Sequence, residues 1–494
     1  MDHIPVFVME WVIVILYCTA LGYIFLFSMG QLHLTWNYRK ARKKGKQEQT
    51  PLATDIKSYP IVTVQLPVYN EKYVAERLVR TIAQFDWPDD KLDIQVLDDS
   101  DDETTEIIAK AINSVERPIK INHVRRKVRK GFKAGALDYG LSLAKGEFVA
   151  IFDADFMPEK DFLKRTVPQF EENTGVVQTR WGHVNRDYSL LTRLQAFALD
   201  AHFTIEQTGR GHAGSFINFN GTGGVWRKEC IADAGGWSDD TLTEDLDLSY
   251  RAQLKGWKFK YLEDCVAPAE LPVIMPSIKS QQYRWNKGAA ESARKNLGNV
   301  FRSGIGWTNK IHALFHLLNS AVFICLLAAA LLSVPVLFVS GDHPAMQVLM
   351  YLGGVFMTGF FSIIFFYWAA TRATVPNAPL SFFLKTFPLF LVVSMGLSLH
   401  NGLAVLEGLL GFKTPFVRTP KFNIQSKSDG WKDNKYISLK IAPLTFVEGA
   451  LALYFFGGAV YGVLAGGWSM APFHLMMGLG FAAVFYYSVR PRYA

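Results

Sequence analysis

The stretch Phe148–Phe162, FVAIFDADFMPEKDF, joins a short apolar run to two carboxylates, Asp153 and Asp155, that lie one residue apart. The run is typical of a buried β-strand, and an amphipathic helical pattern follows Pro158. Carboxylates at the C-terminal end of such a strand lie in the crevice where open α/β sheets bind ligands. They suit Mg²⁺ or Mn²⁺ carrying a diphosphate, because those ions prefer carboxylate, water and phosphate oxygens. The alternative is an acidic turn that caps the next helix.

The composition divides the chain into a soluble part and a membrane part. Of its 494 residues, 19% are charged, whereas soluble domains average about 25%. Residues from about 50 to 300 have an ordinary globular composition, while the first 30 residues and those beyond about 310 are strongly apolar. The sequence therefore predicts a soluble domain held between membrane segments.

The N-terminal apolar run, Trp11 to Met29, is long enough to cross a hydrocarbon core about 30 Å thick. A basic cluster follows it at residues 39–46, whereas a cleaved signal peptide carries its positive charges before the apolar run. We expect a retained transmembrane helix within residues 1–35, with its N-terminus outside or lumenal. The cluster then belongs to a basic juxtamembrane linker, residues 36–58, beside acidic lipid headgroups. The net charge of +8 therefore does not indicate a nucleic-acid partner, and none is expected.

The soluble domain opens with strand-like runs that alternate with helical patterns. The runs lie at residues 61–66, 92–97 and 119–124. This alternation predicts a mostly parallel sheet that binds its ligand at the strand C-termini, where Asp98 and Asp99 follow the second run. Because the sequence contains neither GxGxxG nor GxxxxGK[ST], a nucleotide here would be held by carboxylates and other side chains.

Two glycine-containing stretches have the chemistry of binding loops. Arg125–Leu137, RRKVRKGFKAGAL, precedes a helix, and its basic residues and glycines make a favourable diphosphate site, the alternative being a solvated basic loop. Ser215–Arg227, SFINFNGTGGVWR, combines glycines with aromatic residues and suits the close approach of a sugar.

Two further motifs lie downstream. In Thr243-Glu244-Asp245, one carboxylate can take the proton from an attacking hydroxyl, although an ordinary helix cap also explains the triplet. In Gln281-x-x-Arg284-Trp285, the indole offers a stacking face for a sugar and the guanidinium a fork for phosphate. A membrane-surface helix with an interfacial tryptophan is the alternative for this second motif.

Asp98-Asp99, Asp153-Ala154-Asp155, Thr243-Glu244-Asp245 and Gln281-x-x-Arg284-Trp285, in this order, resemble the motifs of the processive family-2 glycosyltransferases. That group contains the cellulose, hyaluronan, chitin and mannan synthases. FNGTGGVWR, QVLDDS, KAGAL and LKGWKF are most similar to the plant cellulose-synthase-like A and C proteins, which make β-1,4-mannan or the glucan backbone of xyloglucan. The resemblance implies an α/β GT-A domain, with a mostly parallel mixed sheet and helices on both faces, plus a helical transmembrane domain.

The resemblance also implies a role for each matching residue. Asp245 would be the catalytic base, with Glu244 beside it, and Asp153 and Asp155 would hold Mg²⁺ or Mn²⁺. The nucleotide sugar would contact Pro67, Tyr69, Glu71, Asp98, Asp99, Lys133, Asp153, Gln281, Arg284, Thr419 and Lys421. The acceptor would contact Phe219, Asn220, Gly221, Thr222 and Trp285. Thr419 and Lys421 belong to Phe416–Lys421, which is similar to the FxVTxK gating loop of cellulose synthases but has Arg418 where that pattern has valine; a basic juxtamembrane loop is the alternative.

The C-terminal part contains apolar runs at residues 311–340, 346–370, 380–411, 442–466 and 470–489. If all five crossed the membrane, the strongly basic loop 413–440 would lie outside, contrary to the positive-inside rule. The run 380–411 also carries Lys385, His400 and Glu407, which are poor residues for a lipid-facing span. We therefore expect an interfacial or re-entrant helix there and about five spans in all, one before the soluble domain and four after it.

The expected organisation follows the chain from the basic linker onward. It comprises a cytosolic GT-A catalytic domain at 59–276, interfacial helices with QxxRW at 277–310, two transmembrane helices at 311–371, an interfacial or re-entrant helix at 378–411, a cytosolic gating-type loop at 412–441, and two transmembrane helices with the C-terminus at 442–494.

The resemblance implies an inverting, processive membrane glycosyltransferase that uses a UDP- or GDP-hexose to extend a β-linked polysaccharide, of the β-1,4-glucan or mannan type, and moves it across the membrane. Its partners would be the nucleotide sugar, the growing glycan and membrane lipids. The alternative enzyme transfers one sugar to a lipid acceptor and makes a glycolipid. A non-enzymatic transporter or scaffold is disfavoured, because Asp153, Asp155 and Asp245 are all present. The expected location is the plasma (inner) membrane in a bacterium or the Golgi membrane in a plant-like cell; the sugar, the nucleotide and the linkage stay open.

Overall fold

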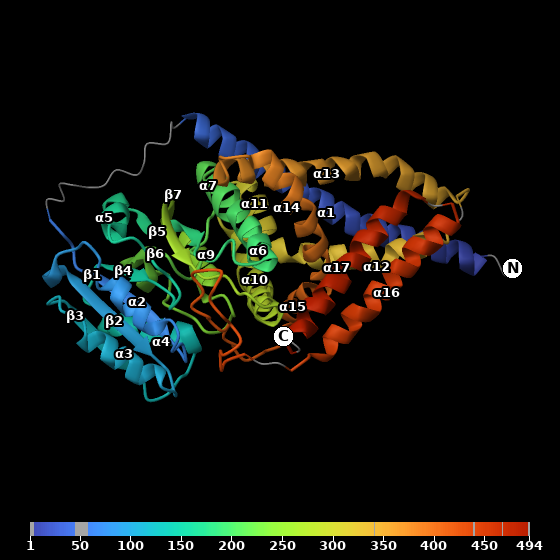
Figure 1. Cartoon of the computed structure of the whole chain (residues 1–494). Helices are drawn as coiled ribbons and strands as arrows, with labels where there is room; N and C mark the ends of the chain where they lie inside the picture. The colour runs from blue at the N-terminus through green and yellow to red at the C-terminus, as the bar shows by residue number, and fades with distance from the viewer. Residues whose placement is uncertain (1–3, 45–57, 340, 438–439, 467, 493–494) are drawn as a thin grey trace.

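A computed structural model of the chain describes residues 4–44, 58–339, 341–437, 440–466 and 468–492. Figure 1 shows a globular α/β domain at one end of the molecule and a bundle of long helices at the other. Residues 45–57, the larger part of the expected basic linker, lie outside the described residues. The soluble domain and the apolar helices therefore occupy separate parts of the molecule.

A seven-stranded mixed sheet forms the centre of the globular domain, in the order β3-β2-β1-β4-β6-β5-β7. The strands are β1 (Val62–Val68), β2 (Leu92–Asp98), β3 (Lys120–Arg125), β4 (Phe148–Ile151), β5 (Thr174–His183), β6 (Gly224–Arg227) and β7 (Lys258–Ala269). Only β6 runs antiparallel to its neighbours, so the expected mostly parallel mixed sheet is confirmed. β6 itself was not expected, because its residues belong to the FNGTGGVWR stretch, whose glycines indicate a turn.

Helices cover both faces of the sheet. α2 (Ala75–Ile82), α3 (Thr104–Asn113) and α5 (Phe162–Thr166) pack on one face, and α4 (Phe132–Leu143), α8 (Lys228–Asp233) and α9 (Glu244–Leu254) on the other. Successive side chains of a strand point to opposite faces. Phe148 and Ala150 therefore enter the first core, and Val149 and Ile151 the second. Burial on both faces explains why this strand reads as an unbroken apolar run.

The carboxyl ends of β1, β2 and β4 meet at one edge of the sheet. Val68 pairs with Asp98, and Gln65 pairs with Ile151, the last residue of β4. The backbone N–H of Phe152 then donates to the carbonyl of Gln65 at 3.1 Å, which holds the chain in register up to Asp153. The polar residues that follow each strand consequently lie close together, as the sequence predicts.

A second group of helices lies between the sheet and the bundle. It comprises α6 (Leu190–Ala201), the π-helical turn η3 (His202–Glu206), α7 (Gln207–His212), α10 (Met275–Arg302) and α11 (Trp307–Leu317). Short 3₁₀ turns complete the structure, at η1 (Asp89–Lys91), η2 (Val167–Gln169), η4 (Asn319–Ala321), η5 (Trp468–Met470) and η6 (Arg490–Arg492). α10 carries the Gln281-x-x-Arg284-Trp285 motif to the sheet edge.

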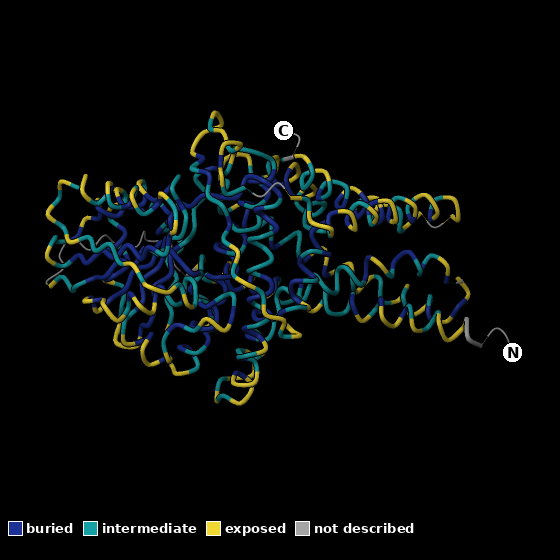
Figure 2. The backbone as a smooth tube through the Cα atoms, turned by 90° about the horizontal axis from the view of Figure 1, so that it is seen from below, coloured by how far each residue is buried: buried dark blue, intermediate teal, exposed yellow. Residues whose placement is uncertain are grey.

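The bundle consists of long apolar helices whose outer faces are exposed (Figure 2). They are α1 (Ile4–Lys44), α12 (Val322–Val336), α13 (Pro344–Thr374), α14 (Pro379–Gly396), α15 (Ser398–Leu410), α16 (Pro443–Leu464) and α17 (Ala471–Val489). Large hydrophobic side chains such as Leu16, Phe361 and Leu453 are exposed on them, which in water would be unfavourable over so wide a surface. Among the described residues, six helices are long and apolar enough to cross a membrane, and the chain is accordingly a membrane protein.

The sixth of these helices is α14, which lies in the run that we expected to be interfacial or re-entrant. α14 ends where Gly396 meets α17 so closely that a Cβ on Gly396 would lie 2.2 Å from the carbonyl oxygen of Gly480. α15 then packs on α10, where a Cβ on Gly408 would lie 2.6 Å from the carbonyl oxygen of Lys287. The chain that follows α15 returns to the globular domain, as the contacts of the next section establish.

Candidate active site

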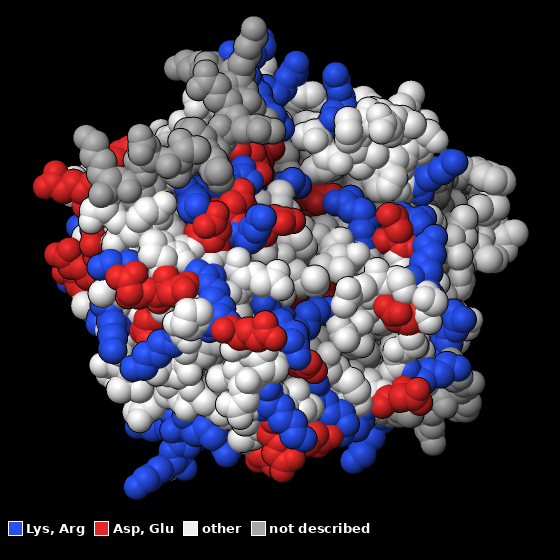
Figure 3. Space-filling view, turned by 60° about the vertical axis from the view of Figure 1, so that its left-hand side comes forward, with Lys and Arg blue, Asp and Glu red and all other residues white. Residues whose placement is uncertain are grey.

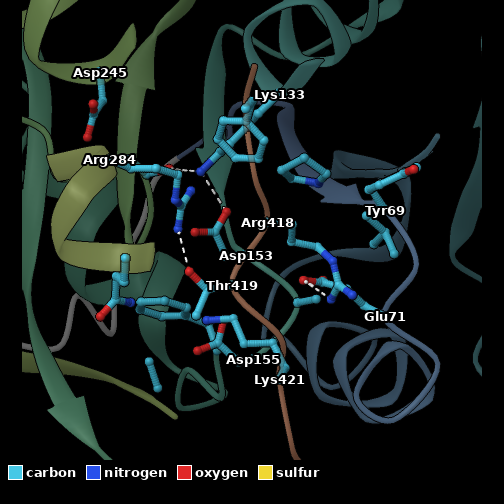
Figure 4. Close-up of a pocket in the computed structure, with 18 of the residues that line it drawn as sticks. Tyr69, Glu71, Lys133, Asp153, Asp155, Asp245, Arg284, Arg418, Thr419 and Lys421 are labelled. Atoms are coloured by element: carbon cyan, nitrogen blue, oxygen red, sulfur yellow. Dashed lines mark hydrogen bonds and ion pairs between the residues drawn. The ribbon is translucent and has the colours of Figure 1, made fainter. Parts of the chain in front are cut away.

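A pocket opens at the carboxyl edge of the sheet, beneath α10 and the loop that follows α15 (Figure 4). Most of the expected site residues line it. They are Pro67, Tyr69, Glu71, Asp99, Lys133, Asp153, Asp155, Asn220, Gly221, Glu244, Asp245, Gln281, Arg284, Trp285, Thr419 and Lys421. Residues from the start, the middle and the end of the sequence therefore meet in one cavity.

Three expected residues, Asp98, Phe219 and Thr222, lie behind the pocket wall. The carboxylate of Asp98 is buried, accepts a hydrogen bond from the Ser100 N–H at 2.9 Å and lies 2.9 Å from Nε2 of His123. Phe219 is fully buried in the core, and Oγ1 of Thr222 accepts the backbone N–H of Asp153 at 2.9 Å. These side chains hold the wall in place and do not face the cavity.

Asp153 is paired with Lys133. Nζ of Lys133 donates to Oδ1 of Asp153 at 2.6 Å and to the carbonyl of Gly221 at 2.9 Å. Although burial opposes protonation, Asp153 and Glu244 raise the pKa of Lys133, so the ammonium stays charged. The lysine comes from the first turn of α4 and belongs to the basic stretch Arg125–Leu137 that the sequence analysis singled out.

Asp155 is almost fully buried and binds the membrane-side loop. Its Oδ2 accepts the N–H of Glu270 at 3.1 Å, and its Oδ1 lies 2.8 Å from Nζ of Lys421. Glu270 in turn accepts the N–H groups of Phe422 and Asn423 at 2.9 and 2.8 Å. The loop after α15 is thus fixed to the sheet edge at Asp155 and Glu270.

The same loop covers the pocket, where it contacts α10 and the segment after β1. Nη2 of Arg284 donates to Oγ1 of Thr419 at 2.9 Å, and its guanidinium lies 4.8 Å from the ring centre of Phe416. Arg418 approaches Glu71 at 3.4 Å, which joins the loop to the segment after β1 (Figure 4). Burial raises the pKa of Glu71 to about 7, while Arg418 and Lys421 act in the opposite direction.

Asp245 lies in the first turn of α9 and is half-buried at the opposite side of the pocket. Burial raises its pKa, and the neighbouring carboxylate of Glu244 raises it further. Thr243 makes no side-chain capping hydrogen bond, so the capping explanation of this triplet lacks its central contact. Gly221 faces Asp245 with φ +78°, and a Cβ there would lie 3.0 Å from Oδ2. Glycine therefore supplies both the backbone conformation and the space that this carboxylate needs.

Beside Tyr69 and Asp99 lie two arginines that motif matching missed, Arg129, which lines the pocket, and Arg126, which does not. The guanidinium of Arg129 lies 3.4 Å from the ring centre of Tyr69, and Nη2 of Arg126 donates to Oδ2 of Asp99 at 2.5 Å. Their signal in the sequence is the basic stretch itself, which predicts positive charge without indicating which side chains face inward. Lys and Arg alternate with Asp and Glu over this face of the domain (Figure 3), and many of them pair with each other.

The part of the pocket beside Trp285 is aromatic. The ring centres of Trp285 and Trp181 are 6.5 Å apart, and Nε1 of Trp181 donates to the carbonyl of Thr222 at 3.3 Å. Nε2 of His202 lies 3.1 Å from Oδ1 of Asn220. Trp181 and Glu270 line the pocket but carry no motif, and they were missed because only the fold brings their strands to it.

A mostly parallel α/β sheet whose strand ends carry paired carboxylates, attached to an apolar bundle, is the GT-A architecture that the motifs led us to expect. Residues 60–288 match the family model described as "Glycosyltransferase like family 2", and the four motifs of the sequence analysis all lie within this range.

Curated relatives share this domain. Glucomannan 4-beta-mannosyltransferase 1 of Oryza sativa subsp. japonica is 40% identical over 300 residues, which cover 56% of this chain and 57% of the relative. Glucomannan 4-beta-mannosyltransferase 7 of Arabidopsis thaliana is 44% identical over 253 residues, which cover 50% of this chain and 46% of the relative. The chain thus spans about half the length of the curated relatives it matches.

Among solved structures, the mannosyltransferase PcManGT from Pyrobaculum calidifontis, in complex with GDP-Man and Mn²⁺, is similar with a TM-score of 0.55 and 21% identity. The match covers 82% of this chain and 100% of that one. At this identity the likeness is one of fold, and it agrees with the GT-A architecture described above.

Proposed function

We propose that the chain is an inverting, processive membrane glycosyltransferase that extends a β-1,4-linked mannan from GDP-mannose. The observation that carries the proposal is the meeting of Asp245, Asp153 and Asp155 in one pocket with the Arg284–Thr419 contact to the membrane-side loop. The names of the relatives support mannose as the sugar, and the GDP-Man in the Pyrobaculum calidifontis protein supports its nucleotide.

Asp245 is the proposed base. The acceptor hydroxyl forms the new bond to C1 of the donor sugar while the bond from C1 to the diphosphate breaks, and the electron pair leaves with the diphosphate. The hydroxyl proton passes to the Asp245 carboxylate. Its raised pKa suits this role, because a base must hold the proton more tightly than an exposed aspartate would.

Lys133, Arg284 and Lys421 are proposed to stabilise the departing diphosphate. All three are charged side chains that line the pocket, and their nearest acidic partners include Asp153 and Asp155. Fixed positive groups act strongly in a site that excludes water, because they need no reorganisation when charge develops. Arg284 in addition presents a fork that matches two phosphate oxygens.

The carboxylates fit a divalent cation. Asp153 and Asp155 line the same pocket, and their Oδ1 atoms hold the ammonium groups of Lys133 and Lys421 at 2.6 and 2.8 Å, where a divalent cation would replace them. Among the described residues, no cluster of three or more acidic, histidine or cysteine side chains is arranged for a metal. Mg²⁺ is commonly held by one or two carboxylates together with water and substrate phosphates. Asp153 and Asp155 would hold Mg²⁺ or Mn²⁺, which when bound neutralises the negative charge of the diphosphate.

A glycan acceptor suits the aromatic end of the pocket better than a lipid does. Trp285 and Trp181 present indole rings beside Asn220, a combination of apolar face and amide that matches sugar rings and hydroxyls. The alternative of single transfer to a lipid acceptor is not favoured, because the relatives are named for a polysaccharide.

The contacts of the loop after α15 support five spans. Lys421 pairs with Asp155 and Thr419 with Arg284, so this loop lies on the same side of the membrane as the catalytic domain. The α14–α15 segment must then begin and end on that side, which fits an interfacial or re-entrant segment and not a single crossing. We place the catalytic domain in the cytosol, where its basic flanks agree with the positive-inside rule.

Cysteine labelling tests this topology. A cysteine placed at the exposed Ser426, in a chain without its native cysteines, should react with a membrane-impermeant reagent only from the cytosolic side. A cysteine at the exposed Glu159 of the catalytic domain is the matched control and should label from the same side. Labelling of position 426 from the opposite side would restore α14 as a full span.

Lys421→Met should weaken use of the donor without unfolding the chain. The substitution removes one charge-assisted contact to the diphosphate, for which we expect a loss of about 10- to 100-fold in kcat/KM. Lys427→Met, at an exposed position of the same loop, is the control and should leave kcat/KM within about twofold. Equal effects of the two substitutions would show that the loop acts only as a basic surface.

A donor panel tests the substrate. The purified full-length chain should transfer radiolabel from GDP-mannose in preference to UDP-glucose and UDP-N-acetylglucosamine. Preference for a UDP-sugar would overturn the assigned donor and keep the transferase class, whereas no transfer from any nucleotide sugar would overturn the proposed function.

A further inference from the structure

A second cavity, of about 310 Å³, lies between α1, α7 and α11. Figure 1 shows these three helices together where the globular domain meets the bundle. The lining of the cavity changes along α1. Leu26 and Phe27 belong to the apolar run of that helix, while Gln31 and His33 lie one turn closer to the basic cluster. One end of the cavity is therefore apolar and the other polar.

Arg210 lines this cavity, and its guanidinium has a donor without an acceptor. Only 3% of Arg210 is exposed, and the hydrogen bond that it makes joins Nη1 to Oε2 of Glu206 at 3.3 Å. Its Nε is buried with no acceptor, although a guanidinium carries five N–H donors. A buried donor without an acceptor is unfavourable, so the Nε of this arginine can take a second anionic partner beside Glu206.

A second unpartnered atom, Oε1 of Gln31, is also buried at the cavity. Nε2 of the same amide donates to Oε1 of Glu206 at 2.9 Å, which fixes the orientation of the side chain. The free oxygen needs a donor such as a hydroxyl group. No carboxylate lines the cavity among the described residues, and Glu206 lies behind Arg210. This lining favours an anion that also carries a hydroxyl group.

Close helix contacts keep the cavity open at its ends. A Cβ on Gly209 of α7 would lie 2.5 Å from the carbonyl oxygen of Leu34, and Nδ1 of His33 lies 3.0 Å from Nε2 of His312 on α11. Between these contacts, a Cβ on Gly30 would meet no atom within 4 Å. The space is thus bounded by tight packing at fixed points, and Gly30 faces into it.

The rim is built for entry from the membrane. Leu26 and Ile311 line the cavity and are 54% and 51% exposed. Trp307, the first residue of α11, is 71% exposed, in the position that tryptophan favours at the boundary of a bilayer. A molecule that reaches the cavity past this rim comes from the lipid phase.

We propose that an anionic phospholipid with a hydroxylated headgroup binds in this cavity. Its phosphate contacts Arg210, its headgroup hydroxyl donates to Gln31, and an acyl chain lies along Leu26 and Phe27. The site is separate from the transferase pocket, but Glu206 connects the two, since its Oε2 lies 2.8 Å from Nδ1 of His202 and His202 contacts Asn220. The proposal does not rest on the proposed function.

Native mass spectrometry of the purified full-length chain tests this site, with phosphatidylglycerol as the probe. The wild type should retain one phosphatidylglycerol in preference to phosphatidylcholine, and excess inorganic phosphate should not displace it. Gly30→Leu fills the cavity and leaves Arg210 in place, and it should weaken retention about tenfold or more. Gly22→Leu is the matched control, because a Cβ at Gly22 also meets no atom within 4 Å but Gly22 does not line the cavity.

Three results would overturn the proposal. The first is equal retention by the Gly30→Leu and Gly22→Leu chains. The second is that the wild type retains phosphatidylcholine as well as phosphatidylglycerol, which would show that the charge of the headgroup does not matter. The third is displacement of phosphatidylglycerol by inorganic phosphate, which would identify a soluble anion as the ligand. Arg210→Gln should also lose the lipid. If that variant misfolds, Gly30→Leu still tests the site, because it keeps the Arg210–Glu206 contact.

Discussion

Replacing Asp245 with asparagine should abolish sugar transfer while donor binding stays near the wild-type level. The substitution keeps the size of the side chain and removes its ability to take the proton of the attacking hydroxyl. Loss of a general base costs about 10²- to 10⁴-fold in rate. The measurement is kcat for the radiolabelled donor beside the Kd for that donor. Asp239→Asn, which neutralises an exposed aspartate before α9, is the control and should keep kcat.

The pH profile of the wild type and of Glu244→Gln adds a second readout. Asp245 acts as a base only when deprotonated, so kcat falls as the pH drops through its pKa. Burial and the carboxylate of Glu244 raise that pKa, which moves the acid limb above the ordinary aspartate value of about 3.9. Glu244→Gln should shift the limb to lower pH. Near-normal turnover by Asp245→Asn would remove Asp245 from this role. An acid limb at the same pH in Glu244→Gln and in the wild type would do the same.

The second large effect is expected from Asp155→Asn. This substitution weakens a metal ligand and leaves the ammonium of Lys421 without its carboxylate at 2.8 Å. We expect a loss of about 4 kcal/mol in transition-state stabilisation, roughly a thousandfold in rate. Turnover should also disappear when EDTA removes divalent cations and return with Mg²⁺ or Mn²⁺. The exposed Glu159, four residues away, provides the control Glu159→Gln.

The two readouts separate the metal from the ion pair. If Asp155 acts only by anchoring the loop, Asp155→Asn should slow transfer while activity of the wild type resists EDTA. EDTA-resistant activity would therefore contradict the metal assignment and keep the loop contact. Full activity of Asp155→Asn would contradict both.

Much of this site could be predicted because its residues lie at the ends of regular elements. Asp153 and Asp155 follow β4, and Glu244 and Asp245 begin α9, so hydrophobic periodicity places them at the sheet edge. Asp98 shows where such reasoning ends. It lies at the end of β2 as expected, but its carboxylate hydrogen-bonds Ser100 behind the wall, because the local turn and not the strand end sets its direction.

The residues that sequence reasoning missed depend on contacts between distant segments. Glu270 directly follows β7 and belongs to no motif, yet it fixes the loop at Phe422 and Asn423. Trp181 lies near the end of β5 and reaches Trp285 in the pocket only because β5 adjoins β6. The sequence predicts a turn at β6, because the three residues before it are Gly221, Thr222 and Gly223. Pairing with β4 overrides that local preference. The cavity at Arg210 likewise depends on the packing of three helices, and no single one of their sequences indicates a binding site.

The most direct test of the central claim is the chemical nature of the product. The full-length chain in lipid, supplied with radiolabelled GDP-mannose and a divalent cation, should make a product that resists chloroform extraction and is cut to small oligosaccharides by an endo-β-1,4-mannanase. Label that moves entirely into the organic phase, or a polymer that the mannanase leaves intact, would contradict a processive β-1,4-mannan synthase.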